Sequence, residues 1–318
     1  GVGIMSTGIT DDIDAAMALS EEKLEDPSSV IRTATICGLG IAYAGSKKEN
    51  LEELLIPIVS GESENDVPFS EVCFAALTLG LSFVGTCHLE IAGVIVQRIM
   101  ESDEELNQSI SKMLAVGLGL LFLGKTESCD ATLEALGCIE HSRAKYAAVT
   151  LESFAYAGTG NVLQVQKLLK MCAERLTEDA DHQAAAVIGI SLIAIGEEMG
   201  IEMSLRTFEH LLHYGELPVR RLVPLAIALL YISNPDYAIV DQLSRLSHDS
   251  DPELAMAAIF GLGLVSAGSN NSRVAGLLRN LADLNAKEAD HLFLVRIAQG
   301  LNASAKGLVS FSPFHSDR

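Results

Sequence analysis

The sequence predicts an all-α protein, a helical-repeat solenoid of about nine two-helix units with a period of about 37 residues. Two observations carry this prediction. A Gly- and Ala-rich block recurs along the whole chain, and amphipathic segments with apolar residues three and four apart lie between the blocks. No segment shows the alternating period of a β-strand. We therefore expect stacked helix pairs in two layers.

The repeated block reads Gly-Leu-Gly-apolar-x-x-Ala-Gly, with clear copies such as GLGIAYAG, GLGLLFLG and GLGLVSAG. The nine copies end at Gly8, Gly45, Gly85, Gly124, Gly158, Gly196, Ser233, Gly268 and Ala305. Ser233 and Ala305 close two degenerate copies. Successive ends lie 34 to 40 residues apart, a spacing typical of supersecondary units that stack on their neighbours.

Each unit is expected to contain one inner and one outer helix. The Gly-rich helix is apolar almost all round, so it is predicted to be buried in an inner layer. Glycine costs a helix about 1 kcal/mol relative to alanine, so its repeated use indicates close packing of backbones. Residues 50–59, 89–100 and 162–172 are predicted outer helices. Asp251-Pro252 and Asn234-Pro235 are both interpreted as a cap followed by proline at the first helical position.

Composition excludes several classes of protein. The chain has 42 Asp+Glu against 22 Lys+Arg, a net charge of −20, whereas nucleic-acid binding needs clustered basic residues. A hydrophobic share of 49% is too high for disorder, and no apolar run reaches the ~18 residues of a membrane span. The six cysteines lack CxxC spacing and lie mostly in apolar stretches, which predicts free, buried thiols in a reducing compartment.

Two motifs imitate catalytic or ligand-binding chemistry. Residues 119–126, GLLFLGKT, match the phosphate-loop pattern, but their Leu, Leu, Phe and Leu belong to the end of a predicted helix rather than to a flexible loop after a strand. His210 and His213 lie three apart on a predicted outer helix without a third ligand nearby. The sequence therefore predicts no enzyme, no catalytic residue, no metal site and no cofactor. We expect residues 1–318 to form one repeat domain, a fragment of a longer chain.

Acidic residues concentrate in the first third of the chain. Residues 1–110 hold 19 Asp+Glu and 5 Lys+Arg, a net charge of −14. Within the predicted helix 89–100 and its end, Glu90, Val94, Gln97 and Glu101 are spaced four, three and four, so they share one stripe. This stripe suits a partner with an apolar patch ringed by Lys and Arg. The alternative is a solvated face without a partner.

Several stretches resemble a known family. They are GLGIAYAGSKKE, FVGTC, AYAGTGNVLQVQKLL, GISLIAIGEEMGIEMSLRTFEHLLHYGE, LSHDSDPE, GSNNSRVAGLLRNLA and FSPFHSDR. Together they resemble the proteasome/cyclosome-repeat region of the largest non-ATPase scaffold subunits in the regulatory-particle base of the 26S proteasome. The other large repeat-bearing base subunit is the competing identification, and LRTFEHLLHYGE speaks against it.

The resemblance implies a toroid of two concentric helical rings, or part of one, with no catalytic activity. It implies binding of ubiquitin chains and of the ubiquitin-like domains of shuttle factors, contacts with the ATPase ring and other regulatory-particle subunits, and a cytoplasmic and nuclear location. The family's receptor positions correspond to Glu90, Gln97 and Glu101 here, with Gln97 in place of a carboxylate. Asp66, in an adjacent repeat, is a weaker candidate. A purely structural scaffold with a passive acidic face is the alternative.

Overall fold

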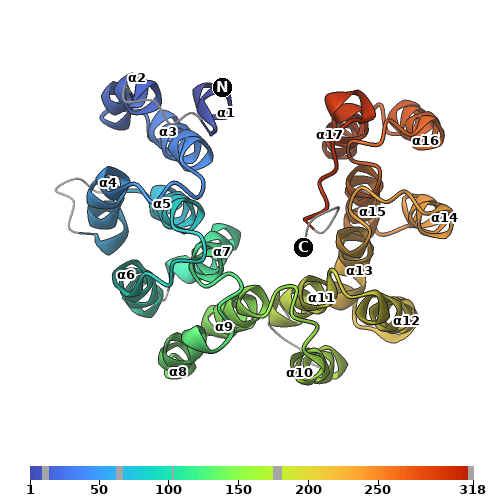
Figure 1. Cartoon of the computed structure of the whole chain (residues 1–318), viewed down its shortest axis with the longest axis horizontal. Coiled ribbons are helices and arrows are strands. Elements are labelled where there is room, and N and C mark those ends of the chain that lie inside the picture. Colours follow the sequence, from blue (N-terminus) through green and yellow to red (C-terminus); the bar gives the residue numbers. More distant parts are fainter. Residues whose placement is uncertain (9–13, 62–66, 102–103, 175–180, 314–318) are drawn as a thin grey trace. The chain divides into compact units, whose positions relative to one another are not determined.

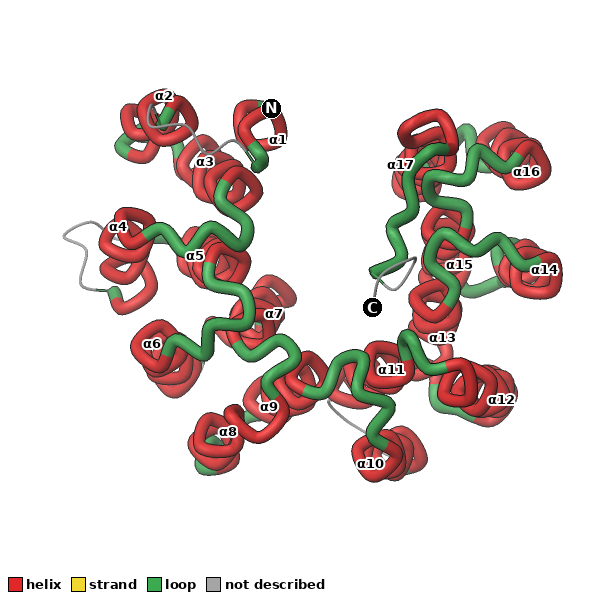
Figure 2. The backbone as a smooth tube through the Cα atoms, in the orientation of Figure 1, coloured by secondary structure: helices red, strands yellow, loops and turns green. Residues whose placement is uncertain are grey.

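A computed structural model describes residues 1–8, 14–61, 67–101, 104–174 and 181–313 of the chain (Figure 1). Within these ranges every regular element is a helix, and Figure 2 shows no strand among them. The all-α helical-repeat prediction is therefore confirmed. The structure divides into two compact units, Gly1–Tyr156 and Ala157–Arg318.

Helix bounds follow the predicted repeats closely. The first unit contains α1 (Val2–Ser6), α2 (Ala15–Leu24), α3 (Ser29–Ala42), α4 (Glu49–Ser60), α5 (Phe69–Ser82), α6 (Leu89–Glu101), α7 (Lys112–Leu121), α8 (Asp130–Gly137) and α9 (Ser142–Ala155), with 3₁₀ helices η1 (Glu105–Asn107), η2 (Ser109–Ser111) and η3 (Thr126–Cys129). The second unit contains α10 (Val162–Ala173), α11 (Asp181–Ala194), α12 (Glu198–Tyr214), α13 (Leu217–Leu230), α14 (Tyr237–Leu246), α15 (Pro252–Val265), α16 (Ser272–Leu284), α17 (Ala289–Ala303) and η4 (Ser304–Gly307).

Each unit has the two predicted layers. In the first unit the Gly-rich helices α1, α3, α5, α7 and α9 pack one on the next, and α2, α4, α6 and α8 lie outside them (Figure 1). In the second unit α11, α13, α15 and α17 form the inner row, with α10, α12, α14 and α16 against it. A single domain spanning both units and closure into a toroid stay predictions.

The end of each repeated block is a turn with left-handed backbone. All nine predicted end positions have positive φ, between 48° at Ala305 and 89° at Gly196, and the degenerate Ser233 adopts 57°. At six of them the backbone N–H donates to a carbonyl near the C-terminal end of the next inner helix. Examples are Gly45 to Leu81, at 2.9 Å between N and O, and Gly268 to Leu301, also at 2.9 Å. These bonds satisfy carbonyls that a helix leaves unpaired at its end.

A second rung follows two residues later in several turns. The N–H groups of Lys47, Cys87, Gly160 and Asn270 donate to the next carbonyl along the same inner helices, with N to O distances of 2.9 to 3.1 Å. All four donors also have positive φ. Together the two rungs form what we call the turn ladder, which at six of the nine block ends joins the turn to the following inner helix by backbone alone.

Inner helices also approach one another closely where glycines face. A Cβ atom added at Gly80 of α5 would lie 2.4 Å from the carbonyl oxygen of Gly117 in α7, and one added at Gly117 would lie 2.5 Å from that of Ala76. Real Cβ atoms cannot sit so close to backbone. Gly80 and Gly117 of the repeated block are thus packing positions, as predicted, whereas a Cβ at Gly38 would meet no atom within 4 Å.

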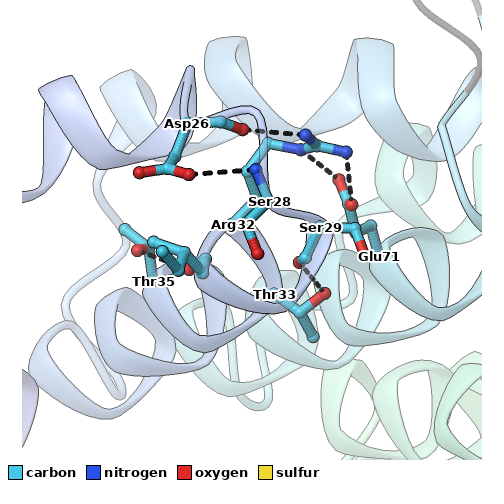
Figure 3. A network of polar contacts seen from close by, with 8 residues as sticks. Asp26, Ser28, Ser29, Arg32, Thr33, Thr35 and Glu71 are labelled. Atoms are coloured by element: carbon cyan, nitrogen blue, oxygen red, sulfur yellow. Dashed lines mark hydrogen bonds and ion pairs between the residues drawn. The ribbon is translucent and has the colours of Figure 1, made fainter.

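Ion pairs join neighbouring inner helices at their opposite, N-terminal ends. Arg32 of α3 makes a bidentate contact with Glu71 of α5, at 3.0 Å and 2.7 Å between nitrogen and oxygen, and also donates to the carbonyl of Asp26 (Figure 3). In the second unit Arg221 of α13 contacts the carboxylates of Asp251 and Glu253 at 2.8 Å and 2.9 Å. The guanidinium group is planar and carries several N–H donors, so it is well suited to pair with carboxylate oxygens.

Some local predictions were wrong. Asp251 caps α15 by accepting the N–H of Glu253, as expected, but α14 is capped by Asp236 through the N–H of Ala238, not by Asn234 ahead of Pro235. Asp236 occupies the N-cap position directly before the first helical residue, whereas Asn234 lies two residues further from the helix. All six cysteines are free, yet Cys138 is exposed because it follows the end of the short helix α8.

Substituting Gly45 by alanine is expected to lower the free energy of unfolding by about 1 kcal/mol, because an L side chain is strained at a φ of 72°. Its Cβ would meet no atom within 4 Å, so backbone strain alone is tested. The matched control is Gly38→Ala in α3, which also meets no atom but lies inside a helix, and it should stabilise by about 0.5 kcal/mol. Urea denaturation of both variants measures the difference, and equal effects would refute the turn-ladder argument.

Stability should fall with acid through Asp251. The hydrogen bond from Arg221 is the main cause that lowers the pKa of Asp251 below its usual range. The unfolded chain therefore takes up this proton first, and the stabilisation, complete above the unfolded pKa of about 4, is lost as pH falls through the folded pKa. In Asp251→Asn, the free energy of unfolding should therefore change less between roughly pH 5 and pH 2 than in the unaltered chain. Asp236 is the control, because it also caps a helix but makes no ion pair among the described residues. Asp236→Asn should leave the pH dependence of the free energy of unfolding unchanged.

Candidate functional site

Helix α6 carries the predicted stripe, and its other face anchors it in the first unit. The Nδ1 atom of His88 accepts the N–H of Ile91 at 3.5 Å, just as the helix begins. Ile91, Ile95 and Ile99 are buried, at 0 to 2% exposure, one turn apart on the inward side. Apolar residues at this spacing orient the helix and leave the opposite side to solvent.

The predicted residues gather on that outward side. Glu90, Gln97 and Glu101 are exposed, and Val94 between them is half-buried. The Nε2 atom of Gln97 donates to Oε1 of Glu101 at 2.8 Å, so the amide and the carboxylate are held as one acceptor-rich pair. Asp66 lies outside the described residues.

Two apolar residues that sequence reasoning missed flank the stripe. Leu89 is 71% exposed and Met100 is 55% exposed, near opposite ends of α6. Both break the inward apolar pattern of the helix, which is the signal that could have identified them. We call Leu89, Glu90, Val94, Gln97, Met100 and Glu101 the α6 face.

Contacts at both ends hold the α6 face in place. His88 Nε2 lies 3.4 Å from Oε1 of Glu52 on α4, and Arg98 Nη2 lies 3.4 Å from Oε2 of Glu105 in η1. Arg98 is partly buried in this pair, with its side chain 20% exposed. In the described part of the chain neither Glu90 nor Glu101 has a cationic partner, so the face keeps its negative charge.

Neither the phosphate-loop pattern nor the histidine pair has the geometry of the binding site that it resembles in sequence. Gly119 lies inside α7, where an added Cβ would be 3.0 Å from the ring of Phe154, and Gly124 forms a repeat turn whose N–H donates to the carbonyl of Phe154. A phosphate loop instead follows a strand and leaves its amides free for the ligand. His210 and His213 are exposed on α12, and no group of three metal-ligating side chains occurs among the described residues. None of the described helices combines the length and the apolar character needed to cross a bilayer.

Known proteins are similar to this chain both in its repeat and along its full length. The proteasome/cyclosome repeat family matches residues 257–289, which span most of α15 and all of α16. The 26S proteasome regulatory subunit rpn-1 of Neurospora crassa is 47% identical across the full chain, which corresponds to 36% of that protein. The chain belongs to the Rpn1-type family of proteasome regulatory subunits.

Further relatives agree with this assignment. The 26S proteasome non-ATPase regulatory subunit 2 of Dictyostelium discoideum is 43% identical and its homolog B of Arabidopsis thaliana 48% identical, each over the full chain. This Rpn1-type chain spans about a third of the length of these relatives, 35% and 36%. The left-handed turn after α15 recurs at the eight other block ends, so the repeat extends well beyond the matched residues.

Proposed function

We propose that this Rpn1-type chain is a non-catalytic scaffold segment of the proteasome regulatory particle that receives ubiquitin and ubiquitin-like domains on the α6 face. The observation that carries the proposal is the composition of that face: exposed Glu90 and Glu101 on either side of Val94 and Gln97, with Leu89 and Met100 at its ends. Such a surface is complementary to an apolar patch surrounded by basic residues.

The fold supports a scaffold rather than an enzyme. Stacked repeats present long, rigid outer surfaces, and the names of two of the relatives cited describe them as non-ATPase subunits. We extend this to contacts with the ATPase ring and other regulatory-particle subunits and to a cytoplasmic and nuclear location. Nucleic acid and membranes are not expected partners. Asp66, in the link before α5, stays a weaker candidate for the same receptor surface.

A passive scaffold would require fewer specific features of the α6 face. A solvated acidic surface needs no order among its side chains and no exposed aliphatic groups. The exposure of Leu89 and Met100 on the same face as Glu90 and Glu101 favours a binding surface, because exposed apolar groups rimmed by polar residues are typical of interaction sites.

Reversing charge at both ends of the stripe tests the receptor proposal. Glu90→Arg with Glu101→Arg is expected to weaken binding of a ¹⁵N-labelled ubiquitin-like domain by about tenfold or more, because attraction becomes repulsion. The measurement is an NMR titration, which also identifies the basic and apolar residues of the domain that contact the chain. Affinity of the unaltered chain should fall as salt rises, since these charges are exposed.

The matched control places the same charge change elsewhere. Glu21→Arg with Glu22→Arg alters two exposed residues of α2, which is also an outer helix of the first unit. This variant should bind within about twofold of the unaltered chain if the site is local. Equal weakening by both variants would show a mere net-charge effect, and no binding by the unaltered chain would favour the passive scaffold.

Restoring a carboxylate at position 97 should strengthen the same interaction. Gln97→Glu adds a third exposed negative charge to the stripe and is expected to raise affinity about threefold. It also replaces the bond to Glu101 with repulsion one turn apart, which lowers helix stability by a few tenths of a kcal/mol (about 0.3). Gln97→Met, which loses the hydrogen bond without adding charge, is the control and should not gain affinity. A loss of affinity in Gln97→Glu would contradict the role given to Gln97.

A further inference from the structure

The chain after α17 turns back along the inner row of the second unit. Three consecutive residues, Ala305, Lys306 and Gly307, have positive φ, at 48°, 57° and 85°. Consecutive left-handed residues form a tight turn, and the N–H of Leu308 closes it by donating to the carbonyl of Ala305 at 3.1 Å. Figure 1 shows the chain then running from α17 back toward α15 and α13. We call residues 307–311 the strap.

The strap crosses the turn that follows α15. A Cβ atom added at Gly268 would collide with the carbonyl oxygen of Val309 and would lie 3.6 Å from the ring of Phe311. At the other end of the strap, a Cβ atom added at Gly307 would lie 3.1 Å from the Cβ atom of Asn270. Contacts this close leave no space for a further side chain. The glycine at this block end therefore makes room for the strap.

The far end of the strap is bonded to the turn that follows α13. The N–H of Phe311 donates to Oγ of Ser233 at 2.8 Å, across 78 residues of sequence. Ser233 keeps a side chain at a φ of 57°, a conformation that disfavours every L residue. Its own N–H makes the turn-ladder bond to the carbonyl of Leu264 at 3.1 Å, which needs no side chain. The hydroxyl that this turn does not need thus serves the strap.

Most of the apolar surface of the strap faces solvent. Leu308 is 87% exposed, Val309 45% and Phe311 48%. A cavity of about 230 Å³ lies between the strap and the turns beneath it, with Ala267 and Ser310 among its lining residues. A segment that buries so little apolar area can open at low free energy while the helices beneath it stay folded. One hydrogen bond is then a large part of what keeps the strap closed.

The closed strap also covers two bonds of the turn ladder. The N–H groups of Gly268 and Asn270, both at the contact with the strap, donate to the carbonyls of Leu301 and Asn302 at 2.9 Å each. These bonds join the turn after α15 to the end of α17. The strap therefore links three successive turns, since it starts after α17, contacts the turn after α15 and ends at the turn after α13.

We propose that the strap is a conformational switch that opens and closes over the turns after α15 and α13, and that the hydroxyl of Ser233 holds it closed. In the closed state the strap shields the two ladder bonds and fixes the chain after α17 to a turn two repeats earlier. In the open state its apolar side chains leave the turns together, while the helices of the inner row stay packed. Serine at one turn and Gly268 at the next are the two sequence features that this switch requires.

Amide hydrogen exchange of the whole chain, followed by NMR, tests the role of the hydroxyl. Ser233→Ala and Ser233→Gly both remove it, so the amide of Phe311 should exchange about fivefold faster in each, the equivalent of one net hydrogen bond. Only Ser233→Gly relieves the left-handed strain, so it should have the higher urea midpoint of unfolding. If exchange at Phe311 merely followed overall stability, the two variants would differ at this amide.

Two control variants separate the strap from its surroundings. Ser46→Ala removes a hydroxyl beside the block end at Gly45, in the other unit, and should leave exchange at Phe311 unchanged. Gly268→Ala places a Cβ atom against the strap and should speed this exchange, whereas Gly45→Ala introduces similar backbone strain into open space and should not. Far-UV circular dichroism checks that every variant is folded.

Limited proteolysis gives a second measurement. Chymotrypsin cleaves after Leu308 and Phe311, and at low protease concentration the rate follows the population of the open strap. Cleavage there should be about fivefold faster in both Ser233 variants than in the unaltered chain. The proposal is overturned if neither variant speeds exchange or cleavage, or if exchange at Phe311 is slower in Ser233→Gly than in the unaltered chain. It is also overturned if Ser46→Ala speeds that exchange as much as Ser233→Ala.

Discussion

The turn ladder is the interaction on which the rest of the structure depends. At six of the nine block ends a left-handed residue donates its N–H to a carbonyl that the next inner helix leaves free, as Gly45 does to Leu81 and Gly85 to Leu120. Each such bond contributes about 1 kcal/mol net, but it also fixes the spacing of the repeats. That spacing in turn demands glycine where α5 meets α7, at Gly80 and Gly117. The turns, the spacing of the repeats and the small residues between the inner helices therefore depend on one another.

The turn ladder uses only backbone atoms of the inner row. The side chains on the outward faces of the outer helices are therefore not needed for stacking and can serve in binding. In α6 only the isoleucine side is committed to packing, and the opposite side carries carboxylates and exposed apolar groups. In α12 and α14 the same freedom allows arginines and histidines to line a groove. The repeats therefore hold surfaces of different composition on one type of framework, without altering how the framework stacks.

Much of this architecture can be predicted from the sequence because the constraint repeats. The spacing identified all nine block ends, including Ser233 and Ala305 where glycine is absent, and the structure then shows positive φ at each of them. The stripe on α6 followed from helical periodicity. Local caps were less predictable: Asp236 and Asn234 are both good cap residues, and only the path of the chain decides between them. The strap could not be foreseen, because it depends on how the chain turns after α17 and on which earlier turn the N–H of its last residue reaches.

The direction of the turn ladder has a consequence for how the chain is made. Every rung joins a turn to a helix that comes later in the sequence, and the longest, from Gly45 to Leu81, spans 36 residues. Such loops close at nearly the same small entropic cost, whatever the total number of repeats. During synthesis each turn can therefore be secured as soon as the following inner helix has emerged, with no need to wait for the end of the chain. A long repeat protein built in this way exposes only its most recent, still unpaired turn.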